Sequence, residues 1–293
     1  MYSPSEEGRV QALRDLRILD TPPEDRFDRI VRVAQRLFDA PAAQINLIDR
    51  DRQWTKATVG REPGNGPRHD SVCTYTIGQE GPLVVEDLRA DPRFQSIPAV
   101  TGEDPLRFYA GQPLRAPGGE RVGSLCILDT KPHSIDAADL GLLRDLADLV
   151  EKELAMSAEL SQAAEVQRQL LPKVPPTVPG YQIAGRCVPA AEVGGDFFDW
   201  LTLDDGTPQI TLADVMGKGI PAALIAASVR AILRGGSLHN GLEAAVNQSA
   251  LGMEPDLDET GRFVTLFTAR IDQATGTVTY VDAGHGLSII LDT

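Results

Sequence analysis

Two short stretches decide how the second half of this chain folds: Glu-Val-Gly-Gly-Asp-Phe-Phe-Asp at residues 192–199 and Ala-Asp-Val-Met-Gly-Lys-Gly at residues 213–219. Each places an aspartate beside glycines at the end of an apolar strand. Asp-Asp-Gly at residues 204–206 predicts a tight turn between the two strands, which therefore pair antiparallel. We expect Asp196, which begins the first strand, and Asp214, which ends the second, to share one edge of a sheet.

This pair of aspartates predicts a metal site. Two neighbouring carboxylates repel each other unless a cation neutralises them. Carboxylate and main-chain carbonyl oxygens are hard ligands, which suit Mg²⁺ or Mn²⁺ better than Zn²⁺ or Cu²⁺. The flanking glycines lack a Cβ, so the main chain can approach an ion or a phosphate closely. The alternative is that Asp196 and Asp214 are only turn or capping residues, as aspartate often is.

Length, composition and charge limit the class of protein. The 293 residues are about twice a ~150-residue domain, which predicts two domains. The net charge of −14 would repel phosphate backbones and anionic lipid, so neither nucleic acid nor a membrane is an expected partner. The three cysteines are widely spaced, which argues against a disulfide framework. The sequence starts without the basic and then apolar segment of a secretion signal, and it has no span of ~20 apolar residues. These features predict a cytoplasmic protein.

The first part of the chain, residues 1–134, is predicted to be an α+β domain with an antiparallel sheet. Thr21 and Glu24 have the spacing of a capping box before a helix. Short apolar runs separated by turn residues predict the strands, at 43–48, 53–59, 83–85, 108–114 and 122–128.

A long helical linker is predicted at residues 135–172, because no Gly or Pro occurs between Leu142 and Leu171. Positions that alternate in steps of four and three are mostly apolar: Leu142, Leu146, Leu149, Glu153, Met156, Leu160, Ala163, Gln167 and Leu170. This 3.5-residue period predicts a left-handed coiled coil and a homodimer, which Glu153 and Gln167 on the seam would weaken. The alternative is a helix packed on its own domain.

The remainder, residues 173–293, is predicted to be a second α+β domain that is mostly antiparallel. Helices are expected at 220–233 and 242–251, and strands at 181–188, 197–203, 209–215, 263–271, 277–281 and 287–291.

Residues 165–291 resemble the SpoIIE/RsbU-like branch of the PPM metal-dependent protein serine/threonine phosphatases. The matching blocks are 169–172, 192–199, 214–219 with Ala222-Ala223, 263–267 and 282–285. The resemblance implies a β-sandwich flanked by helices, in which two Mn²⁺ or Mg²⁺ ions bridge a water that attacks phosphoserine or phosphothreonine. The implied ligands are the carboxylates of Asp196 and Asp214 and the backbone carbonyl of Val215.

Two further residues of these blocks receive assignments, and one segment of the family is missing. Lys218 could meet the substrate phosphate or be a solvated lysine at a helix start. We assign His285 a structural hydrogen bond rather than a metal bond. In the family, strands after the block at 282–285 carry further ligand carboxylates, which this sequence does not include. We therefore expect weak metal binding, little turnover and an exposed sheet edge.

Residues 9–155 resemble a GAF sensory domain, on the blocks 19–24, 48–54, 68–73, 82–85, 107–111 and 123–126. Such domains enclose a pocket for a small molecule, and many act chiefly as dimerisers. The pocket candidates are Trp54, His69, Cys73, Phe108 and Tyr109, each of which could instead be a core or turn residue. No His follows Cys73, so we do not expect bilin attachment. The sequence does not predict which ligand, if any, the pocket binds.

Together these patterns favour a signalling phosphatase, in which a GAF sensor acts through a dimeric linker on the catalytic domain. The resemblance suggests a phosphorylated STAS-type anti-anti-sigma factor as substrate. An alternative is a non-catalytic scaffold whose phosphatase-like half only binds a partner. A nucleotide cyclase with a Gly-Gly-Asp-Glu-Phe motif is disfavoured, because Phe197 stands where that motif has Glu.

Overall fold

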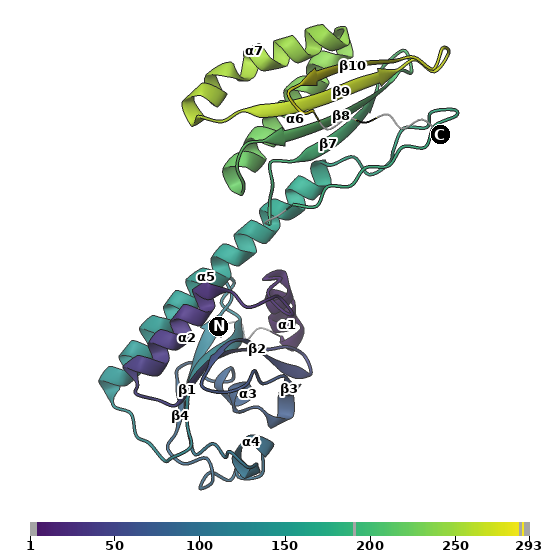
Figure 1. Ribbon diagram of the computed structural model, residues 1–293. Helices are drawn as coiled ribbons and strands as arrows, with labels where there is room; N and C mark the ends of the chain where they lie inside the picture. The colour runs from purple at the N-terminus through teal and green to yellow at the C-terminus, as the bar shows by residue number, and fades with distance from the viewer. Residues whose placement is uncertain (1–4, 190–191, 287–288, 290–293) are drawn as a thin grey trace. The chain divides into compact units, whose positions relative to one another are not determined.

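The computed structural model describes residues 5–189, 192–286 and 289 (Figure 1). The chain divides into two compact units, residues 1–159 and 160–293, and helix α5 (Ala137–Leu170) belongs to both. Each unit combines helices with an antiparallel sheet, so the predicted α+β class is confirmed. No helix in the described part of the chain is long and apolar enough to cross a membrane.

The N-terminal unit is built on a six-stranded antiparallel sheet with the order β3-β2-β1-β6-β5-β4. Its strands are β1 (Ala42–Ile48), β2 (Arg52–Val59), β3 (Gly66–Pro67), β4 (Leu83–Val85), β5 (Phe108–Arg115) and β6 (Arg121–Asp129). One face packs against α1 (Glu6–Asp15), α2 (Asp25–Leu37) and the first part of α5. The other face packs against α3 (Val72–Thr76) and α4 (Pro98–Thr101).

Strand β1 is buried along its whole length because the sheet is covered on both faces. Successive side chains of a strand point to opposite faces. Ile45 and Leu47 therefore join the core under α1, α2 and α5, whereas Ala42 and Ile48 join the core under α3 and α4. Gln44 and Asn46 alternate with Ile45 and Leu47, so this second face also carries buried polar groups.

The predicted capping box is wrong, because a buried lysine takes both of its side chains. Helix α2 begins after Glu24, which makes no side-chain cap hydrogen bond. The ammonium of Lys56, whose side chain is fully buried, donates instead to Thr21 Oγ1 at 2.7 Å and to Glu24 Oε1 at 2.5 Å. A buried charge is costly without such partners. The unpaired N–H groups at the start of a helix can bind water instead, so losing the cap costs less.

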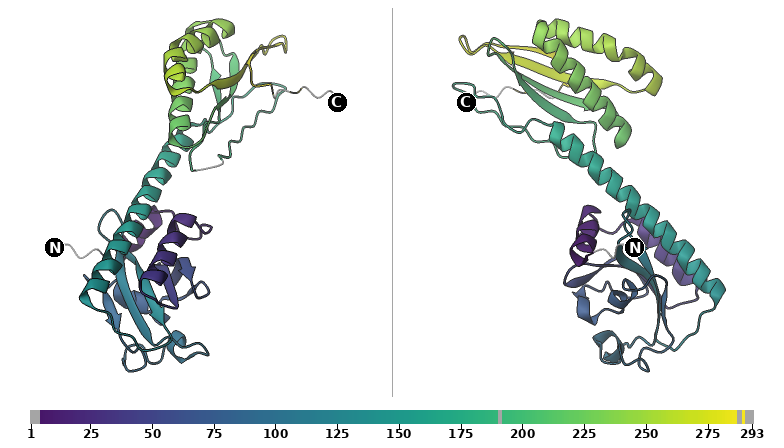
Figure 2. Two further views of the ribbon diagram at one scale, coloured as in Figure 1. Left: turned by 60° about the vertical axis from the view of Figure 1, so that its left-hand side comes forward. Right: turned by 180° about the vertical axis from the view of Figure 1, so that it is seen from behind.

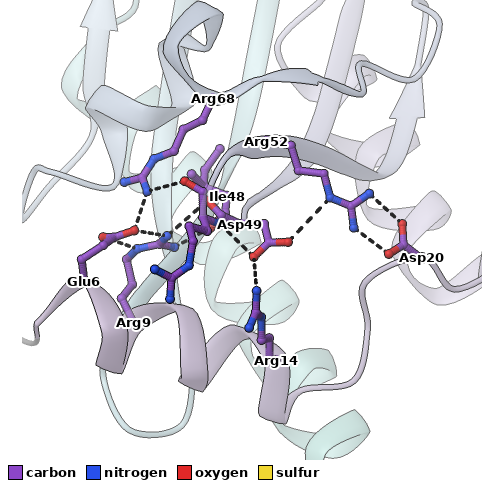
Figure 3. Close-up of polar contacts among 9 residues, drawn as sticks. Glu6, Arg9, Arg14, Asp20, Ile48, Asp49, Arg52 and Arg68 are labelled. Atoms are coloured by element: carbon purple, nitrogen blue, oxygen red, sulfur yellow. Dashed lines mark hydrogen bonds and ion pairs between the residues drawn. The ribbon is translucent and has the colours of Figure 1, made fainter.

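Helix α1 is fixed to the turn between β1 and β2 by a group of arginines (Figure 3). Arg9 is buried and donates to the Ile48 carbonyl and, through Nε and Nη2, to Glu6 at 2.9 and 2.7 Å. Arg68 also donates to Glu6. Arg52 joins the same turn to Asp20 with two hydrogen bonds of 2.9 and 2.6 Å.

The C-terminal unit holds a four-stranded antiparallel sheet with the order β10-β9-β8-β7. Its strands are β7 (Phe197–Thr202), β8 (Pro208–Val215), β9 (Val264–Ile271) and β10 (Val278–Ala283). Helices α6 (Ile220–His239) and α7 (Leu242–Thr260) lie on one face of this sheet (Figure 2). Their apolar side chains form a core with Phe197, Ala213, Val215 and Leu266.

The strand predicted at 181–188 is wrong. Residues 182–189 form no strand, and Tyr181 makes only an isolated bridge with Val178. Gly185 instead lies against the rings of Phe198 and Trp200, so this apolar run covers aromatic side chains of β7 without pairing. Of the strand predicted at 287–291, only residue 289 is described, so it lies largely outside the described residues.

We predict that Glu6→Gln lowers the melting temperature at pH 7 and that the difference shrinks at low pH. Hydrogen bonds from Arg9 and Arg68 lower the pKa of Glu6 from 4.5 to about 2. A carboxyl whose pKa is lowered by folding stabilises the protein above its unfolded pKa, and this contribution disappears as the pH falls through its folded pKa. The side chain is about half exposed, so we expect at most about 1 kcal/mol.

Thermal unfolding of both proteins at pH 7 and near pH 2 measures this difference, with Glu7→Gln as the control. A difference that persists at the lower pH would contradict the assignment.

Candidate metal centre

The two predicted carboxylates lie at the same edge of the C-terminal sheet. The register of β7 and β8 pairs Phe197 with Ala213, which places Asp196, one residue earlier, opposite Asp214. Ala213 and Val215 are buried under the helices, whereas Asp214 is exposed on the other face of the sheet. Both aspartates therefore lie at the end of the strand pair, away from α6 and α7.

The electrostatics of this edge agree with the proximity of the two side chains. The pKa of Asp196 is raised, first by burial and then by a hydrogen bond with Asp214 and by its charge, while His285 acts in the opposite direction. Two carboxylates that approach so closely can be stabilised by a shared proton or by a cation. The geometry thus supplies the like-charged pair that a divalent cation would relieve.

The chain around the pair is held in a conformation that glycine permits. A Cβ at Gly195 would meet the Val215 carbonyl oxygen at 2.5 Å, so only glycine can pass this close to that oxygen. Gly217 has φ +107, in the region that disfavours other residues. Arg262 lies against Gly217 and donates to the Met216 carbonyl at 2.7 Å, which fixes the loop after Asp214. Sequence reasoning did not identify Arg262.

Gln167 of α5 binds the segment that leads into Asp196. Its side-chain amide donates to the Gly194 carbonyl at 2.6 Å and accepts from the Gly194 N–H at 3.1 Å. Sequence reasoning placed Gln167 on a coiled-coil seam and missed this role. The feature that could have indicated this contact is that Gln167 is polar at a position where the 3.5-residue period predicts an apolar residue.

His285 and Lys218 occupy different parts of this edge. The Nδ1 of His285 is 3.1 Å from Thr265 Oγ1, and the main-chain N–H of His285 donates to the Asp282 carboxylate. Thr265 pairs with Asp214 across β8 and β9, so His285 lies beside the pair. Lys218 is exposed in the turn before α6.

The donor atoms fit a hard divalent cation. Two carboxylates and the nearby Val215 carbonyl provide oxygen ligands, which Mg²⁺ and Mn²⁺ prefer. In the described ranges, no group of three or more His, Cys, Asp or Glu side chains comes together to bind a metal. The two aspartates and the carbonyl would therefore fill part of a coordination sphere, and water would fill the rest.

The predicted ligand residues of the N-terminal unit do not lie in one place. Cys73 and Tyr109 line a cavity of about 190 Å³ between the sheet and α3. Trp54 belongs to the opposite face of the sheet, and Phe108 packs on that face with its ring 5.0 Å from that of His133. The side chain of His69 is 81% exposed and stands outside the cavity.

Comparison with known families agrees with both resemblances. The family described as Stage II sporulation protein E (SpoIIE) matches residues 204–293, and the GAF domain family matches residues 22–154. A region that matches the GAF domain family is thus followed by one that matches the SpoIIE family.

This chain covers less than half of the length of each of the following two relatives. The chain is 37% identical over 150 residues to Cyclic di-GMP phosphodiesterase PA2567 of Pseudomonas aeruginosa, covering 51% of this chain and 26% of that protein. It is 32% identical over 133 residues to Phosphoserine phosphatase RsbU of Bacillus subtilis, covering 44% of this chain and 38% of that protein. Among solved structures, a GAF domain of an Acinetobacter phosphoenolpyruvate-protein phosphotransferase aligns with 18% identity and a TM-score of 0.40, over 53% of this chain and 95% of that one.

Without divalent cations, we predict that Asp214→Asn raises the melting temperature at pH 7. Asp196 has a raised pKa in the folded state, so its charge costs stability above that pKa. The gain should fade as the pH falls below the usual carboxyl pKa, because Asp196 then loses its charge in the folded and in the unfolded protein. Because the pair is largely exposed, we expect at most about 1 kcal/mol.

Mn²⁺ should raise the melting temperature of the unmodified protein more than that of Asp214→Asn. Asp204→Asn, an exposed aspartate in the turn between β7 and β8, is the control. An equal response to Mn²⁺ in all three proteins would contradict the site.

Proposed function

We propose that this chain comprises the sensor and catalytic regions of a metal-dependent protein serine/threonine phosphatase. The observation that carries the proposal is the interacting pair of Asp196 and Asp214, in a unit that matches the SpoIIE family. A relative named as a phosphoserine phosphatase supports the reaction class. The proposed substrate is phosphoserine or phosphothreonine on a regulatory protein, with a STAS-type anti-anti-sigma factor as the first candidate.

Each residue of the site has a proposed task. The carboxylates of Asp196 and Asp214 and the Val215 carbonyl would hold Mn²⁺ or Mg²⁺. When bound, such ions lower the pKa of a shared water and offset charge on phosphoryl oxygens. The exposed ammonium of Lys218 is free to approach a phosphate on a protein surface. His285, held by Thr265, would stay beside Asp196, where it opposes the rise in the pKa of that carboxyl.

Regulation is proposed to pass along α5. The first part of this helix packs on the core of the GAF domain through residues such as Leu143, Val150 and Leu154. Near its other end, Gln167 binds Gly194, two residues before Asp196. A shift of the helix would therefore move a metal ligand, and two arrangements of α5 would give two levels of activity.

A second copy of the chain is the proposed partner of α5. Leu142, Leu149 and Met156 recur every seven residues and are 41, 47 and 53% exposed. They lie on a different side of the helix from the residues that pack on the GAF core. This second apolar face supports the predicted homodimer, which stays a prediction.

We expect weak Mn²⁺-dependent release of phosphate from a phosphoserine protein, because only part of the family's ligand set is present, and its loss in Asp196→Asn and in Asp214→Asn. Removing a direct ligand should lower kcat/KM by at least about 100-fold, the upper end for an outer partner of a metal site. Asp204→Asn should keep the activity of the unmodified protein. Full activity in the double Asn variant would overturn the proposal, and tight binding of the phosphoprotein without phosphate release would favour the scaffold alternative.

The coupling through α5 predicts that Gln167→Leu lowers both Mn²⁺ affinity and activity about 10- to 100-fold, as loss of an outer partner does. Gln169→Leu is the matched control, because Gln169 is exposed and its side chain contacts Glu165 of its own helix. Calorimetric titration with Mn²⁺ and the phosphate assay measure both effects. Equal behaviour of the two variants would contradict the coupling.

A further inference from the structure

The GAF cavity carries two buried cysteines on its wall. Cys73 of α3 is 3% exposed and Cys126 of β6 is fully buried, and both line the space of about 190 Å³. Polar side chains share this wall, among them Gln44, Asn46, Ser71 and Tyr109. A space of this size has room for several waters or a small molecule, since one water needs only about 10–15 Å³. A small molecule in this space would lie beside Cys73, which keeps 3% of its surface exposed.

One amide group joins the two sulfurs. The Nδ2 of Asn46 lies 3.4 Å from Cys73 Sγ and 3.5 Å from Cys126 Sγ. The thiol of Cys126 donates to the Gln44 carbonyl at 3.6 Å. The hydroxyl of Tyr109 donates to Cys73 Sγ at 3.5 Å. The cysteines are thus adjacent, and several donors converge on Cys73.

These contacts divide the roles of the two cysteines. Hydrogen bonds, first from Cys126 and then from Ser124, Tyr109 and Asn46, lower the pKa of the Cys73 thiol despite its burial. The pKa of Cys126 is raised, first by its hydrogen bond to Cys73 and then by burial. Because Asn46 and Tyr109 donate to Cys73 Sγ whereas the Cys126 thiol is itself a donor, we assign Cys73 as the thiolate of the pair, and thiolates are the reactive form of cysteine. Cys126 keeps its proton and remains available as the second thiol.

Simple packing does not account for this arrangement. A buried cysteine usually behaves as a small apolar residue and needs no donors around its sulfur. Here Asn46, itself buried, directs its amide at both sulfurs, while its carbonyl accepts from Thr55 Oγ1 at 2.7 Å. The Nδ2 of the amide thereby faces both thiols and also Gln44 Oε1, which lies 3.2 Å away.

We propose that Cys73 and Cys126 form a peroxide-reactive dithiol site in the GAF cavity, which closes to an intramolecular disulfide. The Cys73 thiolate attacks one oxygen of a hydroperoxide and breaks the O–O bond. The leaving oxygen takes up a proton as water or alcohol, and Cys73 becomes a sulfenic acid. The sulfur of Cys126 then attacks Cys73 Sγ, the S–S bond forms, and the hydroxyl leaves with the Cys126 proton as water.

The product would change how α3 is held. A disulfide would tie α3 covalently to β6 and would replace the hydrogen bonds that Asn46 makes to the two thiols. This inference concerns only the N-terminal unit and does not rest on the proposed phosphatase function.

The test treats the fully reduced chain with one equivalent of hydrogen peroxide, then blocks and counts the remaining thiols after denaturation. We expect one free thiol, that of Cys187, and a linked pair of peptides containing Cys73 and Cys126. Cys187→Ser should form the same link at the same rate. Three free thiols, oxidation of Cys187 ahead of the pair, or a link between two chains would overturn the proposal.

Two variants test the order of the steps. Cys126→Ser should stop at a sulfenic acid on Cys73, which dimedone traps, whereas Cys73→Ser should leave Cys126 unreacted. The reverse pattern would contradict the assigned roles. Thermal unfolding of each variant shows whether it folds, and the peptide map of the unmodified chain tests the disulfide without any substitution.

Discussion

Repulsion between the carboxylates of Asp196 and Asp214 is the constraint on which the proposed metal site depends. The register of β7 and β8 forces the two charges together. The core under α6 and α7 fixes that register, because Ala213 and Val215 are buried in it. Gly195 passes against the Val215 carbonyl, and Arg262 holds the following loop. A sheet edge built in this way is unfavourable until a proton or a cation joins it, and this is the physical basis of the proposed divalent-ion site.

Helix α5 has different surroundings along its length. Its early residues belong to the core of the GAF domain, whereas Gln167 belongs to the loop that precedes Asp196. The polar residue that looks like a defect in a heptad pattern is thus a specific contact to a main chain. A single continuous helix with contacts of both kinds is a simple route by which an event in the GAF domain could reach the metal site.

The sequence predicted what depends on local patterns. Strand alternation and a short turn were sufficient to bring Asp196 and Asp214 to one edge, and the long helix followed from the absence of Gly and Pro. Predictions that depend on long-range contacts were wrong, as for the capping box. Lys56 takes Thr21 and Glu24 from their expected capping roles, and its burial cannot be read from residues 21–24.

The face on which a side chain lies was equally hard to predict. Trp54 and Tyr109 are both buried aromatic residues of sheet strands, yet only Tyr109 lines the cavity. The side of the sheet that each residue faces depends on strand register, which the sequence alone leaves open. The apolar run at 181–188 reads as a strand, but its Gly185 lies against the rings of Phe198 and Trp200, and the segment covers these side chains of β7 without pairing.

A crystal of this protein soaked in Mn²⁺, with anomalous diffraction recorded at the manganese edge, tests the central claim most directly. The account predicts an anomalous peak between the carboxylates of Asp196 and Asp214, within bonding distance of both, and no such peak in crystals of the double Asn variant. Carboxylates that point apart with no peak between them, or a peak that survives the double substitution, would contradict it.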